Sequence, residues 1–161
     1  MPNLHVQYAL RVKDAKGNLV DLPPQQALAQ RGPVVQVTIS LGTAMAQVLQ
    51  QQGKPIPAPV SGLALIDTGA TGTCINKDQA EAMGLPVIDV GKMSSATHED
   101  EPSNIHPIKI EFVGVPITVE AERAMCAKLT KFGLLAIIGR DVLQHCNLVY
   151  NGFAGTITLS V

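Results

Sequence analysis

The sequence predicts a mainly β fold in one domain. Hydrophobic residues make up 46% of the 161 residues but aromatic residues only 3%, so the core must consist mostly of Val, Ile, Leu and Ala. β-Branched side chains pack well on a pleated sheet, and this composition therefore suits strands. Short runs of alternating apolar and polar residues, separated by turn-forming residues, support the same class. A chain of this length buries one sizeable core and is too short for two ordinary domains.

The first forty residues predict two strands. Apolar and polar residues alternate strictly over 4–12, which indicates a half-buried strand, and 14–18 then supplies turn-forming residues. We interpret 21–24 as a connector because it ends in two prolines. The β-branched run over 34–41 predicts the second strand.

An insertion follows the second strand. Residues 43–52 are rich in helix-forming side chains, and Gly53 and three alternating prolines come directly after them. We interpret this segment, 43–59, as a short helix and an extended stretch at the surface. A long irregular loop is the alternative.

The middle of the chain predicts a short helix followed by a hairpin. Asn76 or its neighbour can cap a helix over 77–83, and Gly84 provides the stop signal. Residues 87–90 are typical of a strand, and an alternating run over 105–113 follows a polar stretch. These two strands would flank the polar stretch as the arms of a hairpin.

The C-terminal part predicts more strands and one further short helix. The elements expected here are a strand at 117–121, an apolar strand at 133–138, a short helix running to about His145, and a closing hairpin of 148–150 with 156–159. Strands therefore dominate the whole chain.

Composition and charge exclude several classes of protein. The formal net charge is −1 and the basic residues are scattered, so we expect no nucleic-acid partner. The chain has no run of about 18 apolar residues and its first residues lack the pattern of a signal peptide, so we expect a cytoplasmic protein with no membrane partner. Cys74, Cys126 and Cys146 are widely spaced, which fits neither a disulfide framework nor a zinc site and predicts buried free thiols.

The stretch around Asp67 is the most informative for function. Four apolar residues, 63–66, lead into Asp67 and the turn Thr68-Gly69-Ala70, so a carboxylate stands at the end of a buried strand. A carboxylate in apolar surroundings is costly unless it is hydrogen-bonded or paired. Taken alone, the pattern favours a strand-end Asp that caps a turn over a catalytic group.

A second segment favours the catalytic interpretation. The apolar residues 135–138 lead into Gly139-Arg140-Asp141 some 70 residues after Asp67. The two segments, in this order and at this spacing, resemble the retropepsin-like aspartic proteases, and the resemblance covers roughly 60–159. It implies a closed β-barrel of the acid protease type with one or two short helices. The single domain, 1–161, would then comprise N-terminal strands and the insertion (1–59) and a protease core (60–161).

The chemistry of this family implies a homodimer. Aspartic proteases need two carboxylates about 3 Å apart that share one proton, because like charges so close cannot both ionise. The chain contains one Asp-Thr-Gly, so the second carboxylate would be Asp67 of another copy. We therefore expect an aspartic endopeptidase that acts on peptide or protein substrates as a homodimer, with neither a cofactor nor a metal.

The resemblance also implies roles for the residues near Asp67. Thr68 would hydrogen-bond the two loops across the dimer axis, Gly69 would admit the substrate backbone, and Ala70 would line the site. The residues expected to pack beneath the loop are Ile137, Ile138, Gly139 and Arg140. Ordinary core packing is the alternative for the two isoleucines. In retroviral members the arginine pairs with an acid just after the alanine, whereas this chain has Thr71 and Gly72 there.

A flap over the substrate is expected in the polar hairpin. The residues assigned to it are Met93, Ser94, Ser95, Ala96 and Thr97. The whole segment 91–102 has a single glycine, Gly91, where the family has a glycine-rich tip, and a plain surface loop is the alternative. His98 and His106 lie nearby without companion ligands and predict no metal site.

The length of the N-terminal region and the insertion is typical of a bacterial member rather than a viral one. A binding or scaffold domain that has kept the fold but lost turnover is the competing function, because the hairpin is poor in glycine.

Overall fold

A closed β-barrel forms the body of the molecule. The computed structural model describes residues 2–95 and 98–161. Within these residues the larger sheet has the spatial order β4 (Val34–Leu41), β5 (Val60–Ile66), β10 (Ala136–Ile138), β6 (Cys74–Asn76), β9 (Thr118–Ala127), β8 (His98–Phe112) and β7 (Asp89–Ser95). Because β4 also pairs with β8, six of these strands close into a ring and β7 stands outside it. The expected mainly β class with a closed barrel is confirmed.

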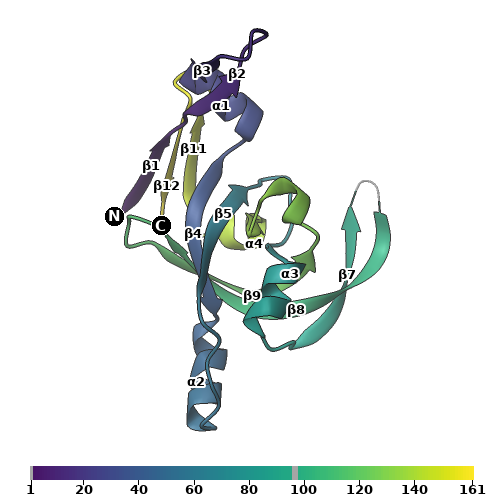
Figure 1. Cartoon of the computed structure of the whole chain (residues 1–161). Helices are drawn as coiled ribbons and strands as arrows, with labels where there is room; N and C mark the ends of the chain where they lie inside the picture. Colours follow the sequence, from purple (N-terminus) through teal and green to yellow (C-terminus); the bar gives the residue numbers. More distant parts are fainter. Residues whose placement is uncertain (1, 96–97) are drawn as a thin grey trace.

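A smaller sheet brings the two ends of the chain together beside the barrel. It has the order β1 (Asn3–Gln7), β12 (Thr156–Ser160) and β11 (Asn147–Asn151), and both pairings are antiparallel. The hairpin of β2 (Leu10–Lys13) and β3 (Leu19–Leu22), together with helix α1 (Pro24–Arg31), lies at the far end of this sheet (Figure 1).

The first predicted strand is in fact two strands with different partners. β1 pairs with β12, whereas β2 pairs with β3. Between them the amide of Tyr8 donates to the carbonyl of Gly155 at 3.0 Å, and the Tyr8 hydroxyl donates to the carbonyl of Val34 at 2.9 Å. The chain thus changes partner while its apolar residues keep alternating, and alternation alone does not reveal such a change.

The connector expected at 21–24 is wrong. Its first half ends β3, and Pro24 begins α1, which continues to Arg31 and ends at Gly32. Ala27 and Leu28 of this helix are fully buried, so packing stabilises a segment that is otherwise rich in glutamine. The proline at its start and the glycine after its end are the signals that could have predicted it.

The insertion does contain a helix, α2 (Thr43–Gln51), so the long-loop alternative is wrong. The carboxylate of Glu120 accepts from the amide of Thr43 at 3.3 Å and also contacts its hydroxyl. This amide, in the first turn of the helix, would otherwise lack a hydrogen-bond acceptor. Met45, Ala46 and Leu49 pack against the core on one side. The helix otherwise projects away from the barrel (Figure 1).

The remaining helices agree more closely with expectation. Helix α3 (Lys77–Met83) has the predicted bounds: the Asn76 side chain accepts from the amide of Asp78 at 3.0 Å, and Gly84 ends the helix with φ of 68°. Helix α4 (Arg140–Leu143) ends two residues before His145. A short 3-10 turn, η1 (Thr130–Phe132), precedes β10. The described residues therefore contain four short α-helices, more than the one or two expected.

The barrel interior is aliphatic. Val37, Ile39, Ile75, Ile110 and Ile138 are fully buried, and burial of each such side chain contributes roughly 1.5–3 kcal/mol. All three cysteines are free, but only Cys126 is buried while the other two are half-buried. In the described part of the chain, no helix is long and apolar enough to cross a membrane.

Candidate active site

Asp67 stands where the parallel pair β5 and β10 ends. Leu65 lies opposite Ile137 and Ile66 opposite Ile138, and the amide of Asp67 then donates to the carbonyl of Ile138 at 3.0 Å. Ile138 is fully buried, so this last bond attaches the start of the loop 67–73 to the core. The position of the Asp67 backbone is thus determined by the barrel rather than by the loop.

The turn after Asp67 orients its carboxylate. The amide of Gly69 donates to Asp67 Oδ1 at 2.8 Å, and the amide of Ala70 donates to the carbonyl of Asp67 at 3.2 Å. The other oxygen, Oδ2, has no hydrogen-bond partner among the described residues. A Cβ at Gly69 would lie 3.0 Å from Oδ1, so a larger residue would require the carboxylate to shift. One carboxylate oxygen is therefore held and the other is available.

Arg140 braces the exposed part of the loop. Its Nη1 donates to the carbonyl of Thr68 at 2.8 Å and to that of Gly69 at 3.0 Å, and its Nη2 donates to Thr71 Oγ1 at 3.0 Å. The arginine therefore contacts two carbonyls and a hydroxyl in place of the acid that retroviral members provide. Hydrogen bonds from a guanidinium are stronger than neutral ones, and three of them restrain a loop whose Thr68 and Gly69 are exposed.

Asp141 and Thr73 fasten the other end of the loop. The amide and the hydroxyl of Thr73 donate to the two carboxylate oxygens of Asp141 at 3.0 and 2.8 Å. Thr73 Oγ1 also accepts from the amide of Gly139 at 3.1 Å, and Thr73 is only 1% exposed. Both oxygens of Asp141 are occupied, so this acid has a structural role. The sequence interpretation assigned no role to either residue, although an acid in the first turn of α4 is a recognisable signal.

Gly139 lets the two segments touch. A Cβ there would lie 2.5 Å from the carbonyl carbon of Gly72, which is closer than any real contact. The backbones of 71–73 and 139–141 are accordingly joined, with the amide of Asp141 donating to the carbonyl of Thr71 at 3.2 Å. The structure thus brings Asp67, Thr68, Gly69 and Ala70 together with the residues 137–140 that were expected to pack beneath them.

Cys74 is the nearest thiol to this loop, and its surroundings make it a poor nucleophile. Burial, and to a smaller degree the negative charges of Asp141 and Asp67, raise the pKa of the Cys74 thiol to about 11. The thiol is neutral at physiological pH and therefore unreactive. No group of three or more His, Cys, Asp or Glu side chains suited to a metal occurs among the described residues.

The segment expected as the flap is a β hairpin. β7 and β8 pair from Asp89 opposite Ile105 out to Ser95 opposite His98, with a register shift after Met93. Ala96 and Thr97 lie outside the described residues, and of Ser94 and Ser95 only the backbone is described. The arms extend away from the barrel beyond α3 (Figure 1). His106 follows Ile105 on β8 and is buried, with its Nδ1 2.9 Å from the carbonyl of Pro86.

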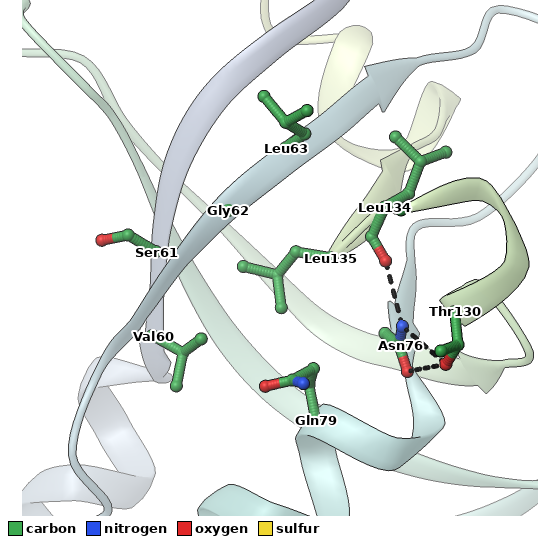
Figure 2. Close-up of a pocket in the computed structure, with 10 residues that line it drawn as sticks. Val60, Ser61, Gly62, Leu63, Asn76, Gln79, Thr130, Leu134 and Leu135 are labelled. Atoms are coloured by element: carbon green, nitrogen blue, oxygen red, sulfur yellow. Dashed lines mark hydrogen bonds between the residues drawn. The ribbon is translucent and has the colours of Figure 1, made fainter.

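Two of the pockets in the described part of the chain lie apart from Asp67. One, of about 280 Å³, lies between β5 and the segment before β10; Asn76 Nδ2 donates there to the carbonyl of Leu134 at 3.0 Å (Figure 2). The other, of about 380 Å³, lies between β1 and β4 and includes Tyr8 and Val34. Asp67 is half-buried at the start of its loop, and neither of these two pockets includes it.

Comparison with known proteins finds similarity at the level of structure alone. No protein-family model matches the chain, and no curated protein matches its sequence. Among solved structures, the crystal structure of a retropepsin-like aspartic protease from Rickettsia conorii is similar with a TM-score of 0.35 and 14% sequence identity, covering 78% of this chain and 90% of that chain. Likeness at this level assigns no activity, so the function must be argued from the geometry around Asp67.

Proposed function

We propose that the protein is an aspartic endopeptidase that hydrolyses peptide bonds by activated water at a pair of Asp67 residues, one from each chain of a homodimer. The observation that carries this proposal is the state of Asp67. Its carboxylate stands on a loop held by Arg140 and Asp141, one oxygen is fixed by the amide of Gly69, and the other has no partner among the described residues.

The reaction needs both members of the pair. One Asp67 carboxylate acts as general base on a water molecule, and the protonated Asp67 of the other chain donates to the carbonyl oxygen of the scissile bond. Water adds to the carbonyl carbon to give a tetrahedral intermediate. Its collapse breaks the carbon–nitrogen bond, with a proton passing to the leaving amine. Because the two acids are strongly coupled, their pKa values belong to the pair and not to either chain.

The residues around Asp67 hold its carboxylate in place and take no direct part in the reaction. The pair must keep its geometry through the reaction, since a small displacement of a catalytic group costs much of its effect. Arg140 and the Thr73–Asp141 contacts restrain the loop on either side of Asp67. The β7–β8 hairpin is the element that would cover an extended peptide chain lying across the two loops.

The experiment compares the wild type with Asp67→Asn on a peptide library from acidic to neutral pH. Asparagine keeps the volume of the side chain but can neither accept the proton of water nor ionise. We expect Asp67→Asn to cleave at least roughly 10³-fold more slowly than the wild type, because the general base is removed. Asp141→Asn is the matched variant, because the Asp141 carboxylate already accepts two hydrogen bonds from Thr73. We expect this substitution to lower the folding stability rather than to remove the chemical step.

Sedimentation of the Asp67→Asn variant is the control. A dimer that forms as in the wild type shows that chemistry alone was removed. Equal cleavage by the wild type and Asp67→Asn, or no cleavage by either, would overturn the proposal.

A binding or scaffold domain is the second candidate, and the hairpin with its single glycine favours it. It predicts that peptides bind the wild type and Asp67→Asn with the same affinity and that neither protein cleaves them. Isothermal titration with peptides from the same library separates the two functions. A cytoplasmic location and a bacterial-type family member remain predictions from the sequence.

A further inference from the structure

The first half of β5 has a strand on one side only. β4 pairs with β5 from Val60 to Leu65, whereas β10 lies beside Ala64 to Ile66 alone. Nearer the start of β5, no strand of the described chain lies on the β10 side of residues 60–62. This part of the barrel wall therefore has an open backbone edge.

Ser61 is the residue whose backbone faces the open edge. In an antiparallel ladder the amide and carbonyl of one residue point to one side, and those of the next residue point to the other. The amide of Ile66 donates to the carbonyl of Pro33 on the β4 side, whereas the Leu63 carbonyl and the Asp67 amide are bonded on the β10 side. Ser61 therefore points toward the β10 side as well. Neither its amide nor its carbonyl has a backbone partner there among the described residues.

The pocket of about 280 Å³ lies against this edge (Figure 2). Besides residues 60–63 and 133–135, three polar side chains line it: Asn76, Gln79 and Thr130. Asn76 Nδ2 lies 3.3 Å from Thr130 Oγ1, whereas the Gln79 side chain has no hydrogen-bond partner among the described residues. All ten residues that line the pocket are uncharged. The pocket thus offers a free backbone edge and a free side-chain amide, but no charge.

We propose that this pocket binds an extended, uncharged segment of a partner protein, which adds to β5 as a strand beside residues 60–62. A residue whose amide and carbonyl both lack partners is what an added strand satisfies, and such addition is a common mode of peptide recognition. Gln79, across the pocket from β5 (Figure 2), would bond to the other edge of that strand. The volume is close to the lower end of ligand pockets, about 300 Å³, and so suits a short segment.

The walls of the pocket also indicate which side chains the segment carries. Alternate side chains of a strand point to opposite faces, so one side chain would enter the pocket beside Val60 and Leu135. Leu135 is only 5% exposed, and we therefore expect an apolar residue at that position of the segment. A charged residue there would lose its water without gaining a partner.

The binding site is separate from the proposed catalytic loop. Asp67 follows the other end of β5, about 20 Å from Ser61 along an extended strand, and lines no part of the pocket. Peptide binding here does not rest on the proposed peptidase function. The variant Asp67→Asn can therefore serve as the background for binding measurements, so that cleavage does not interfere.

Two substitutions at Ser61 separate the backbone from the side chain. Ser61→Pro removes the amide hydrogen that faces the pocket and places a ring where the peptide would lie, while the bonds from β5 to β4 use the neighbouring residues. Ser61→Ala is the matched control. Both variants lose the contact of Ser61 Oγ with Thr38 Oγ1 at 2.8 Å, but only proline loses the amide hydrogen.

The probe is a capped heptapeptide of alternating valine and threonine, titrated into ¹⁵N-labelled Asp67→Asn protein. We expect the NMR signals of the Ser61 and Leu63 amides to shift and the exchange of the Ser61 amide to slow, because a strand then covers them. Adding Ser61→Pro should weaken binding at least roughly tenfold, and adding Ser61→Ala should change it less than about threefold.

A second peptide tests backbone recognition without any change in the protein. It has the same side chains but is N-methylated throughout its central residues, so it lacks the amide hydrogens that a strand needs. We expect no binding of this peptide. If circular dichroism shows that Ser61→Pro is unfolded, the comparison of the two peptides on Asp67→Asn still decides.

Three results would overturn strand addition at Ser61. They are equal binding of the two peptides, equal binding by the proline and alanine variants, and no shift of the Ser61 and Leu63 signals up to the solubility limit of the peptide. A dimer that sedimentation shows to be lost in Ser61→Pro, with no peptide binding to any variant, would make the occupant a second copy of the chain and contradict a peptide partner. Cleavage by the wild type is measured separately and bears on Asp67 alone.

Discussion

At the scale of single residues, the candidate site depends on where a side chain is absent as much as on where one is present. Gly139 touches the backbone of Gly72, and Gly69 touches the carboxylate of Asp67. Neither contact has room for a methyl group without movement. The loop can hold Asp67 closely because Gly69 and Gly139 have no side chain at these contacts.

Gly139→Ala should therefore destabilise the protein strongly. The new Cβ would lie 2.5 Å from Gly72, so the two segments must separate and strain the bonds between Thr73 and Asp141. We expect a loss of at least about 1–3 kcal/mol, the usual cost of overpacking, measured by urea unfolding. Gly72→Ala is the control from the same contact, since a Cβ there meets nothing within 4 Å. Equal stability of the two variants would show that the segments are not in close contact.

At the scale of elements, the hairpin and the barrel are joined near the hairpin base by one exposed ion pair. Arg123 Nη2 on β9 donates to Asp89 Oδ2 at the start of β7 at 2.6 Å. That hydrogen bond, with one from the amide of Val90 and the charge of Arg123, lowers the pKa of the Asp89 carboxyl. The ion pair thus restrains the strand that lies outside the barrel ring.

The direction of this pKa shift gives a pH dependence. A lowered pKa in the folded state means that Asp89 contributes stability above its unfolded pKa of about 3.9, and that this contribution is lost as the pH falls through the folded value. We expect the protection factors of the β7 amides, which correct the exchange rate for its intrinsic pH dependence, to fall in that acidic range. In Arg123→Gln the Asp89 pKa should return toward its ordinary value, as measured by NMR titration of the carboxyl carbon. An Asp89 pKa that does not respond to this substitution would contradict the ion pair.

The elements also differ in how far the sequence could predict them. Helix α3 was predicted with its bounds because its signals are local: Asn76 caps it and Gly84 ends it. The strand at 4–12 was predicted as one element because the alternation does not show that β1 and β2 have different partners. Helix α1 was missed because the burial of Ala27 and Leu28 against distant strands outweighs a weak apolar pattern.

The site shows the same division between local and distant information. The turn after Asp67 follows from Thr68-Gly69-Ala70, and the structure has it. The partners of Arg140 could not be predicted, because two of them are backbone carbonyls about 70 residues earlier in the chain. The pairing of Thr73 with Asp141 likewise depends on the contact between β10 and β6.

At the scale of the whole molecule, one chain supplies one of the two carboxylates that the proposed reaction needs. Asp67 is half-buried, lies outside the two pockets described above, and stands on a loop braced from within the same chain. The barrel supplies the rigid support on which this loop stands. The account therefore requires that the catalytic unit be two chains rather than one.

Mixing active and inactive chains tests that requirement most directly. Wild type and Asp67→Asn are combined at constant total concentration, allowed to exchange subunits, and assayed for peptide cleavage. If both Asp67 residues are needed, activity follows the square of the wild-type fraction, so an equal mixture retains about one quarter of the activity. Activity that falls in direct proportion to the wild-type fraction, to about one half in the same mixture, would show that each chain works alone and would contradict a dyad shared between two chains.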